Sequence, residues 1–176
     1  MKINLPVTQR EIPVPADTYL VSQTNLKGTI TDANEAFVAI SGFTREELMG
    51  QSHNMVRHPD MPAAAFGDMW GSLKAGMPWR GTVKNRAKNG DHYWVDAQIV
   101  PILKNGEITG YMSVRRAPSR QQIAEAEALY ATLRDKTKFP TVKRKPVSLK
   151  LMMNGLLGLS IATLLTSKAI VLLDVP

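Results

Sequence analysis

Two imidazoles, a guanidinium and a carboxylate lie within eight residues of this chain, at His53, Arg57, His58 and Asp60. Burying a charged group without a partner costs several kcal/mol of free energy. Such a cluster in a small domain therefore forms either a closed network or the wall of a ligand site. Pro59 and Pro62 keep residues 53–62 out of regular helix. A third possibility is a solvated loop in which Asp60 caps the helix that follows.

The residue types limit the chemistry that the chain can perform. It has no cysteine, which excludes thiol catalysis, thiolate metal sites and disulfides. His53 and His58 are five residues apart, not four as in a helical metal pair, and no third ligand is evident, so we expect no metal site. No nucleophile and no paired acid and base stand out, so the residues do not indicate an enzyme.

The net charge of +7 is unevenly distributed. Residues 1–133 carry 14 Lys and Arg against 13 Asp and Glu, whereas residues 134–150 carry seven basic residues against one aspartate. The first part is therefore nearly neutral and lacks the clustered basic face of a nucleic-acid-binding surface. We expect no nucleic-acid partner.

Short strands and helices surround the polar stretch. Capping-box spacings at Asp32–Glu35 and Thr44–Glu47 predict two helix starts, and Gly42 and Gly50 predict where these helices end. The predicted elements before residue 80 are strands over 18–23 and 28–31 and helices over 32–42, 44–50 and 61–74. The polar stretch lies between the second and third helices.

An antiparallel meander follows, with predicted strands over 82–86, 92–100 and 108–115. Asn-Gly pairs at 89–90 and 105–106 predict type I′ turns, because both central positions of that turn need positive φ. Pro101 indicates the end of the middle strand or a sheet edge. Trp94 lies on the face of that strand opposite Tyr93 and Val95, where it could pack on a partner or on the chain's own tail.

This order predicts an α+β domain of about 100 residues, in which five antiparallel strands carry short helices on one face. We expect a cavity between the helices and the sheet, with the polar stretch as its wall.

Several motifs resemble the PAS family, and in particular the N-terminal FAD-binding PAS domain of bacterial aerotaxis receptors of the Aer type. Asn-Glu-Ala-Phe at 34–37, Ser-Gly-Phe at 41–43 and Asn-Gly-Asp-His-Tyr-Trp at 89–94 are general PAS features. The narrower signature is His-Asn-Met-Val-Arg-His-Pro-Asp-Met-Pro at 53–62. The resemblance covers roughly residues 7–117 and implies a PAS fold.

The resemblance also implies that FAD binds non-covalently in the cavity and that its redox state changes the hydrogen bonding or packing of the domain. Arg57, His58 and Asp60 match the family's signature positions and are implied to contact or position the dinucleotide. The other implied contacts are Trp79, Asn85, Asn34, Trp70 and His53. Without cysteine, the cysteinyl-flavin photochemistry of related light-sensing domains is not available here.

The side-chain chemistry is compatible with these roles. Arg57 can make a bidentate contact with a phosphate, and Trp79 offers a stacking surface with one N–H donor. Asn85 can both donate and accept, so its amide could flip when a flavin changes protonation. Trp70, at helical spacing with apolar neighbours, could instead belong to the core.

Other functions stay open from the sequence. The domain could bind haem through His53 or His58, or act without a ligand as an interaction module. A small flavoenzyme is a further alternative, although catalysis would need a substrate opening beside the flavin.

Five parts are predicted along the chain: an N-terminal cap over 1–17, a sensor domain over 18–117, a connector helix over 118–136, a basic linker over 137–150 and a possible membrane-anchoring hydrophobic segment over 151–173. A capping box at Ser119–Gln122 starts the connector. Its apolar positions at heptad spacing predict packing on the sheet or on a second copy of the chain, and hence a homodimer. These positions are Ile123, Ala126, Tyr130 and Leu133.

Basic residues directly before the hydrophobic segment place the sensor domain on the cytoplasmic face of the bacterial inner membrane by the positive-inside rule. The alternative for this segment is a buried or interfacial helix. The resemblance implies chemotaxis signalling proteins as partners, reached directly or through a downstream region that these 176 residues do not contain.

Overall fold

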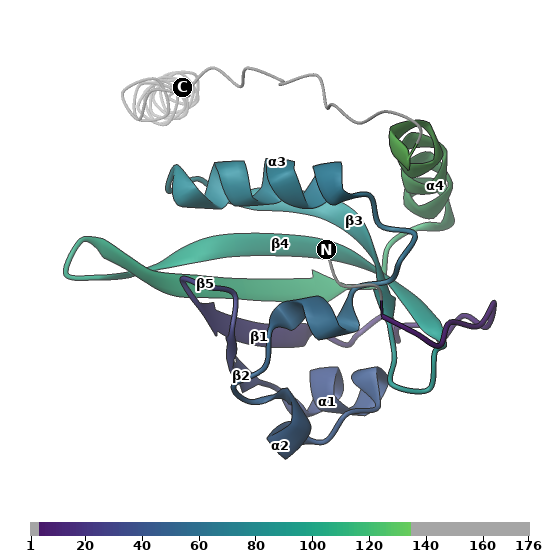
Figure 1. The fold of residues 1–176 in the computed structure, drawn as a ribbon, viewed down its shortest axis with the longest axis horizontal. Helices are drawn as coiled ribbons and strands as arrows, with labels where there is room; N and C mark the ends of the chain where they lie inside the picture. The colour runs from purple at the N-terminus through teal and green to yellow at the C-terminus, as the bar shows by residue number, and fades with distance from the viewer. Residues whose placement is uncertain (1–3, 135–176) are drawn as a thin grey trace, which may run out of the picture. The chain divides into compact units, whose positions relative to one another are not determined.

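Five strands form one antiparallel sheet in the order β2-β1-β5-β4-β3, in a computed structural model that describes residues 4–134 (Figure 1). The strands are β1 (Leu20–Asn25), β2 (Ile30–Ala33), β3 (Trp79–Arg86), β4 (His92–Lys104) and β5 (Glu107–Arg116). The predicted α+β class and the five-stranded antiparallel sheet are therefore confirmed. β1 pairs with β5, with Ser22 opposite Ser113, so the two ends of the domain meet at the centre of the sheet.

The two Asn-Gly turns differ. Asn105 and Gly106 have φ of 53° and 83°, which confirms positive φ at both central positions of the β4–β5 turn. In the β3–β4 loop only Gly90 has positive φ, so the predicted type I′ turn is wrong there. That loop makes tertiary contacts instead: Lys88 donates its backbone N–H to Ser41, and the Gly90 carbonyl accepts from Thr8.

β4 continues through Pro101 to Lys104, so the proline does not end the strand. The last partner of β4 on β3 is Ile99, opposite Trp79. Beyond that pair β4 is an edge strand on this side, where a missing N–H is tolerated. Of the two alternatives predicted for Pro101, the sheet edge is therefore confirmed and the end of the strand is wrong.

Three short helices and one 3-10 helix connect the hairpin to the meander: α1 (Glu35–Ser41), α2 (Arg45–Leu48), η1 (His53–Val56) and α3 (Ala63–Lys74). Thr44 and Glu47 form the predicted capping box, and Gly42 ends α1 in a left-handed conformation. Asn34, not Asp32, caps α1, because the Asn34 side chain accepts from Phe37 N. α3 follows Pro62 with no side-chain cap, so the expectation that Asp60 caps this helix is wrong.

The main core lies between these helices and one face of the sheet. The helices contribute side chains that pack against Tyr93 and neighbouring strand residues, and that are almost fully buried from solvent: Phe37, Leu48, Val56 and Leu73. The other face carries Trp94, which packs with buried residues of α4 (Arg120–Arg134). The Ser119 capping box is present, and α4 packs on the domain's own sheet, one of the two arrangements predicted for the connector.

The N-terminal residues lie along the start of β4. His92 exchanges backbone hydrogen bonds with Arg10 and Ile12, and the Arg86 side chain donates to the carbonyls of Leu5 and Pro6. The predicted basic linker and the hydrophobic segment over 151–173 lie outside the described residues. Within the described part, no helix has the length and apolar character needed to cross a membrane.

Candidate functional site

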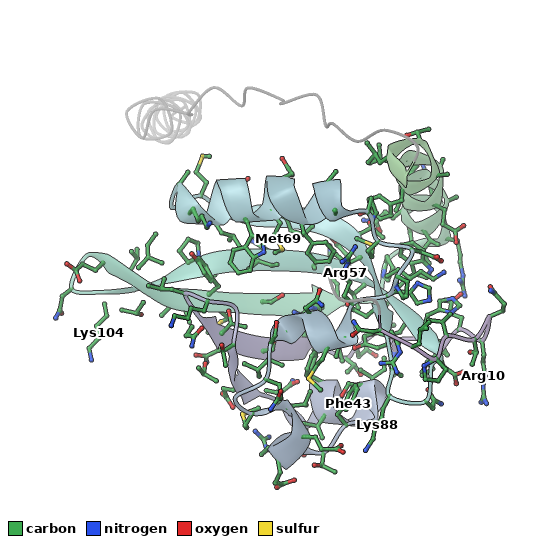
Figure 2. The ribbon with its side chains drawn as sticks, in the orientation of Figure 1. Arg10, Phe43, Arg57, Met69, Lys88 and Lys104 are labelled. Carbon is green, nitrogen blue, oxygen red and sulfur yellow. The ribbon has the colours of Figure 1, made fainter. Side chains whose placement is uncertain are left out.

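A cavity of about 310 Å³ lies between α3, η1 and the inner face of the sheet. Arg57 and Met69, which both line this cavity, are labelled between α3 and the strands in Figure 2. The lining combines apolar side chains of α3 and the strands with polar side chains of β1, β3, β5 and η1. These residues are Ser22, Thr24, Lys27, Gly28, Ser52, His53, Asn54, Arg57, Phe66, Met69, Trp70, Leu73, Val83, Asn85, Ala97, Ile99, Tyr111, Ser113 and Arg115.

Three buried polar atoms of the lining have no hydrogen-bond partner among the described residues: Arg57 Nε, Asn85 Nδ2 and Ser113 Oγ. Their side chains belong to residues that are 8%, 4% and 5% exposed. A buried polar group without a partner costs about 1–3 kcal/mol, and native proteins keep few of them. The lining is therefore suited to a ligand that has hydrogen-bonding atoms as well as an apolar body.

Arg115 is the most deeply buried cation of the cavity. Its guanidinium donates to Ser22 Oγ at 3.1 Å and to His53 Nε2 at 2.8 Å, and it lies 5.2 Å from the centre of the Phe37 ring. Burial lowers the pKa of Arg115 to about 10, so the side chain stays charged at neutral pH. No carboxylate within residues 4–134 forms an ion pair with it.

His53 is neutral in this environment. Burial, and then the charge of Arg115, lower the pKa of His53 to about 3. Because a guanidinium only donates, His53 Nε2 must accept, which places the ring proton on Nδ1. The imidazole thus orients Arg115 without adding charge.

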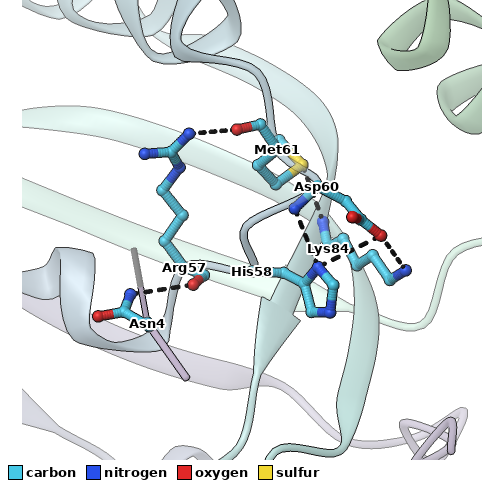
Figure 3. A network of polar contacts seen from close by, with 6 residues as sticks. All are labelled: Asn4, Arg57, His58, Asp60, Met61 and Lys84. Atoms are coloured by element: carbon cyan, nitrogen blue, oxygen red, sulfur yellow. Dashed lines mark hydrogen bonds and ion pairs between the residues drawn. The ribbon is translucent and has the colours of Figure 1, made fainter. Parts of the chain in front are cut away.

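Arg57 forms the wall of the cavity from the turn after η1. Asn4 Nδ2 donates to the Arg57 carbonyl at 3.0 Å, and the Arg57 guanidinium donates to the Met61 carbonyl (Figure 3). The guanidinium carbon also lies 4.8 Å from the centre of the Phe66 ring. Burial lowers the pKa of Arg57 from its ordinary value, but an arginine remains protonated.

The charges of the lining are of one sign. Lys27, Arg57 and Arg115 are cations, and the described lining contains no aspartate or glutamate. A low-dielectric pocket with fixed positive charge favours a ligand that carries, or can take up, negative charge.

His58 and Asp60 do not line the cavity and interact with each other and with Lys84 (Figure 3). His58 Nδ1 accepts from Asp60 N at 3.1 Å, and Lys84 Nζ lies 2.7 Å from Asp60 Oδ2. Burial, followed by the charge of Lys84, lowers the pKa of His58 to about 4, so this imidazole is also neutral. His58, Asp60 and Lys84 therefore form a polar network of their own, although the buried His58 Nε2 has no hydrogen-bond partner among the described residues.

Asn34 and Trp79 also lie outside the lining. The Asn34 amide accepts from Val21 N and Phe37 N and donates to the Tyr19 carbonyl, which ties β1 to α1. The Trp79 indole donates to Asp68 at 2.8 Å. Of the eight residues implied by the resemblance, four line the cavity and four do not. His53, Arg57, Trp70 and Asn85 line it, and direct cofactor contacts of all eight stay predictions.

The part of the cavity wall formed by β1 and β5 was not predicted from the sequence. Tyr111, Ser113 and Arg115 alternate along β5, and Ser22 lies opposite Ser113 on β1. Two-residue spacing of polar side chains near an aromatic residue was a usable signal on β5. The pairing of β1 with β5 joins residues about ninety apart and had no local signal.

Residues 30–115 match the family model described as the PAS fold. The chain is 58% identical over 127 residues to the aerotaxis receptor of Escherichia coli, an alignment that covers 72% of this chain and 25% of the receptor. The chain thus spans about a quarter of the length of this relative. The PAS domain of a Colwellia psychrerythraea protein superposes with a TM-score of 0.53 at 23% identity, over 58% of this chain and 87% of that one. A light-oxygen-voltage domain studied with a flavin analogue superposes at 0.54 with 20% identity, over 67% of this chain and 87% of that one.

Proposed function

Because residues 30–115 form a domain of the PAS family, we propose that this domain is the sensor of an aerotaxis-type signal transducer and that its cavity binds FAD without a covalent bond. The observation that supports this most directly is the set of three unpartnered buried polar atoms, on Arg57, Asn85 and Ser113, in the lining of a cavity whose α3 side is apolar. A flavin ring has an apolar body and a polar edge that both donates and accepts, which fits this lining.

A bound flavin supplies reversible uptake of electrons and protons. The chain's own residues would hold the ring and respond to its charge. Asn85 can donate or accept through its amide, and Ser113 can do the same through its hydroxyl. Arg115, buried and without a carboxylate partner in the described residues, provides a fixed positive charge that His53 and Ser22 hold in place. Negative charge that develops on a ligand beside Arg115 would be stabilised there.

The alternative ligands have less support. Haem coordination by His53 would require Nε2, which already accepts from Arg115, or a change of tautomer. His58 does not line the cavity. A domain without any ligand would leave the three polar atoms without a partner in the described protein. We also propose that the module binds and signals rather than catalyses. Ser22 Oγ lies 3.1 Å from His53 Nε2 in the lining, but the buried Arg115 donates to both atoms. Burial, and then the charge of Arg115, lower the pKa of His53 to about 3, which makes this imidazole a poor general base.

The output route is proposed from the position of α4. The phenol of Tyr130 donates to the Thr82 carbonyl on β3, and α4 packs on Trp94 of β4. A change in the sheet would therefore reach this helix. We propose that it passes to chemotaxis signalling proteins, from a homodimer attached to the cytoplasmic face of the bacterial inner membrane through residues 151–173.

The absorption spectrum of the purified 176-residue chain tests the cofactor, followed by chromatography of the ligand released on denaturation. We expect flavin bands and released FAD. Asn85→Ala should weaken FAD binding, since it removes an unpartnered buried amide of the lining. Asn89→Ala is the control. Asn89 is at an exposed position of the β3–β4 loop, bonds to Asp91 and does not line the cavity, so this variant should bind FAD normally. A folded, colourless protein that does not take up added FAD would refute the proposal.

A further inference from the structure

The size of the cavity restricts how a dinucleotide can bind. At about 310 Å³ it is at the lower end of the range of roughly 300–1,000 Å³ typical of small-molecule sites. FAD has two ring systems joined by a diphosphate, so a cavity of this size accommodates the flavin half only. If the proposed function holds, the diphosphate must cross the rim of the cavity to reach the adenosine outside.

The rim can be identified from exposure. Lys27 and Ser52 are the two lining residues that are classed as exposed to solvent in the described structure. They lie next to each other in space, because Ser52 forms a bridge with Thr29 and His53 N donates to the Gly28 carbonyl at 2.9 Å. The exit of the cavity is therefore beside the β1–β2 turn.

Lys27 is the cation available at this exit. Arg57 and Arg115 are buried and already donate to neighbours, whereas Lys27 is exposed and forms no ion pair with the described residues. An ammonium group on a flexible stem is a common phosphate ligand and needs no particular approach angle.

The backbone that carries Lys27 is fixed. Asn25 Oδ1 accepts from Lys27 N at 2.9 Å and from Thr29 N at 3.1 Å. Gly28 has a φ of 77° and lies against Trp70, where an added Cβ would be 3.2 Å from the indole. The turn therefore holds the Lys27 backbone at the rim, while its side chain is free to reach a ligand.

We propose that Lys27 is a phosphate-binding residue of the cofactor site and that it makes the site prefer FAD over riboflavin. The ammonium pairs with the diphosphate where it leaves the cavity. Riboflavin has the same ring system but no phosphate, so Lys27 would contribute nothing to its binding. This inference rests on the proposed binding of FAD.

The test compares dissociation constants for FAD and riboflavin, measured by quenching of flavin fluorescence with the cofactor-stripped 176-residue chain. An exposed charge contact is worth up to about fivefold in affinity, so Lys27→Ala should weaken FAD binding by about two- to fivefold. Riboflavin binding should stay unchanged. Lys27→Arg should restore most of the affinity for FAD. Lys104→Ala, at the exposed β4–β5 hairpin (Figure 2), is the control and should alter neither constant.

Equal weakening of both flavins by Lys27→Ala would overturn the inference, because it would show a structural role of the turn. Unchanged FAD binding would overturn it as well and would place the diphosphate elsewhere. In both cases binding of flavin by the wild-type chain would leave the proposed function standing. A wild-type chain that binds neither flavin would remove the proposed function and this inference together.

Discussion

Replacing Ser113 by alanine should stabilise the cofactor-free protein and weaken FAD binding. The Ser113 hydroxyl is buried in the cavity wall, 5% exposed as a residue, and has no hydrogen-bond partner among the described residues. Removing an unsatisfied buried polar group recovers part of a penalty of about 1–3 kcal/mol, so we expect the free energy of unfolding to rise by about 1 kcal/mol. With FAD bound, the lost hydrogen bond should cost about 1 kcal/mol, or about fivefold in affinity.

Ser41 provides the matched control. It is also buried, but its hydroxyl donates to the Val38 carbonyl at 3.0 Å and accepts from Phe43 N at 3.4 Å. Ser41→Ala should therefore destabilise the cofactor-free and the FAD-bound protein alike, by about 1 kcal/mol. Urea unfolding of both variants, with and without FAD, measures these differences. If Ser113→Ala destabilises the cofactor-free protein as much as Ser41→Ala does, the hydroxyl is satisfied there and the reasoning fails.

Two further predictions concern the frame of the site. Asn34→Ala should lower the free energy of unfolding by about 1–2 kcal/mol, because it removes the cap of α1 and the hydrogen bond to β1. In the same urea titration, Asp32→Ala should change this free energy by no more than about 0.5 kcal/mol. Equal losses in the two variants would contradict Asn34 as the cap. The pKa values of His53 and His58 are lowered from 6.5 to about 3 and about 4 in the folded protein. Between these values the unfolded chain binds more protons than the folded protein, so the free energy of unfolding should fall as the pH decreases from about 6.5 towards 4. His58→Gln should make urea midpoints less dependent on pH in this window, and an unchanged dependence would show that His58 contributes nothing to it.

Several local signals in the sequence were sufficient to predict the backbone. The capping boxes at Thr44 and Ser119, the left-handed Gly42 and the Asn105-Gly106 turn all appear as predicted, because each depends on residues within one or two turns of chain. The predicted type of the first Asn-Gly turn was wrong because tertiary hydrogen bonds to Thr8 and Ser41 determine the shape of this loop. The wall of β1 and β5 was missed for a related reason, since strand pairing over long separations has no local signature.

The polar stretch shows the same limit within a few residues. From the sequence, a closed network and a ligand site were alternatives for the whole cluster. The structure divides the cluster between the lining of the cavity and a polar network with Lys84. Arg57 has an extended backbone, with φ of −73° and ψ of 128°, and bridges to Asn85 on β3. Successive side chains of extended backbone point to opposite sides, so Arg57 faces the cavity and His58 faces Lys84 and Asp60. The division follows from the pairing of this turn with β3, about thirty residues along the chain, and not from the composition of the cluster.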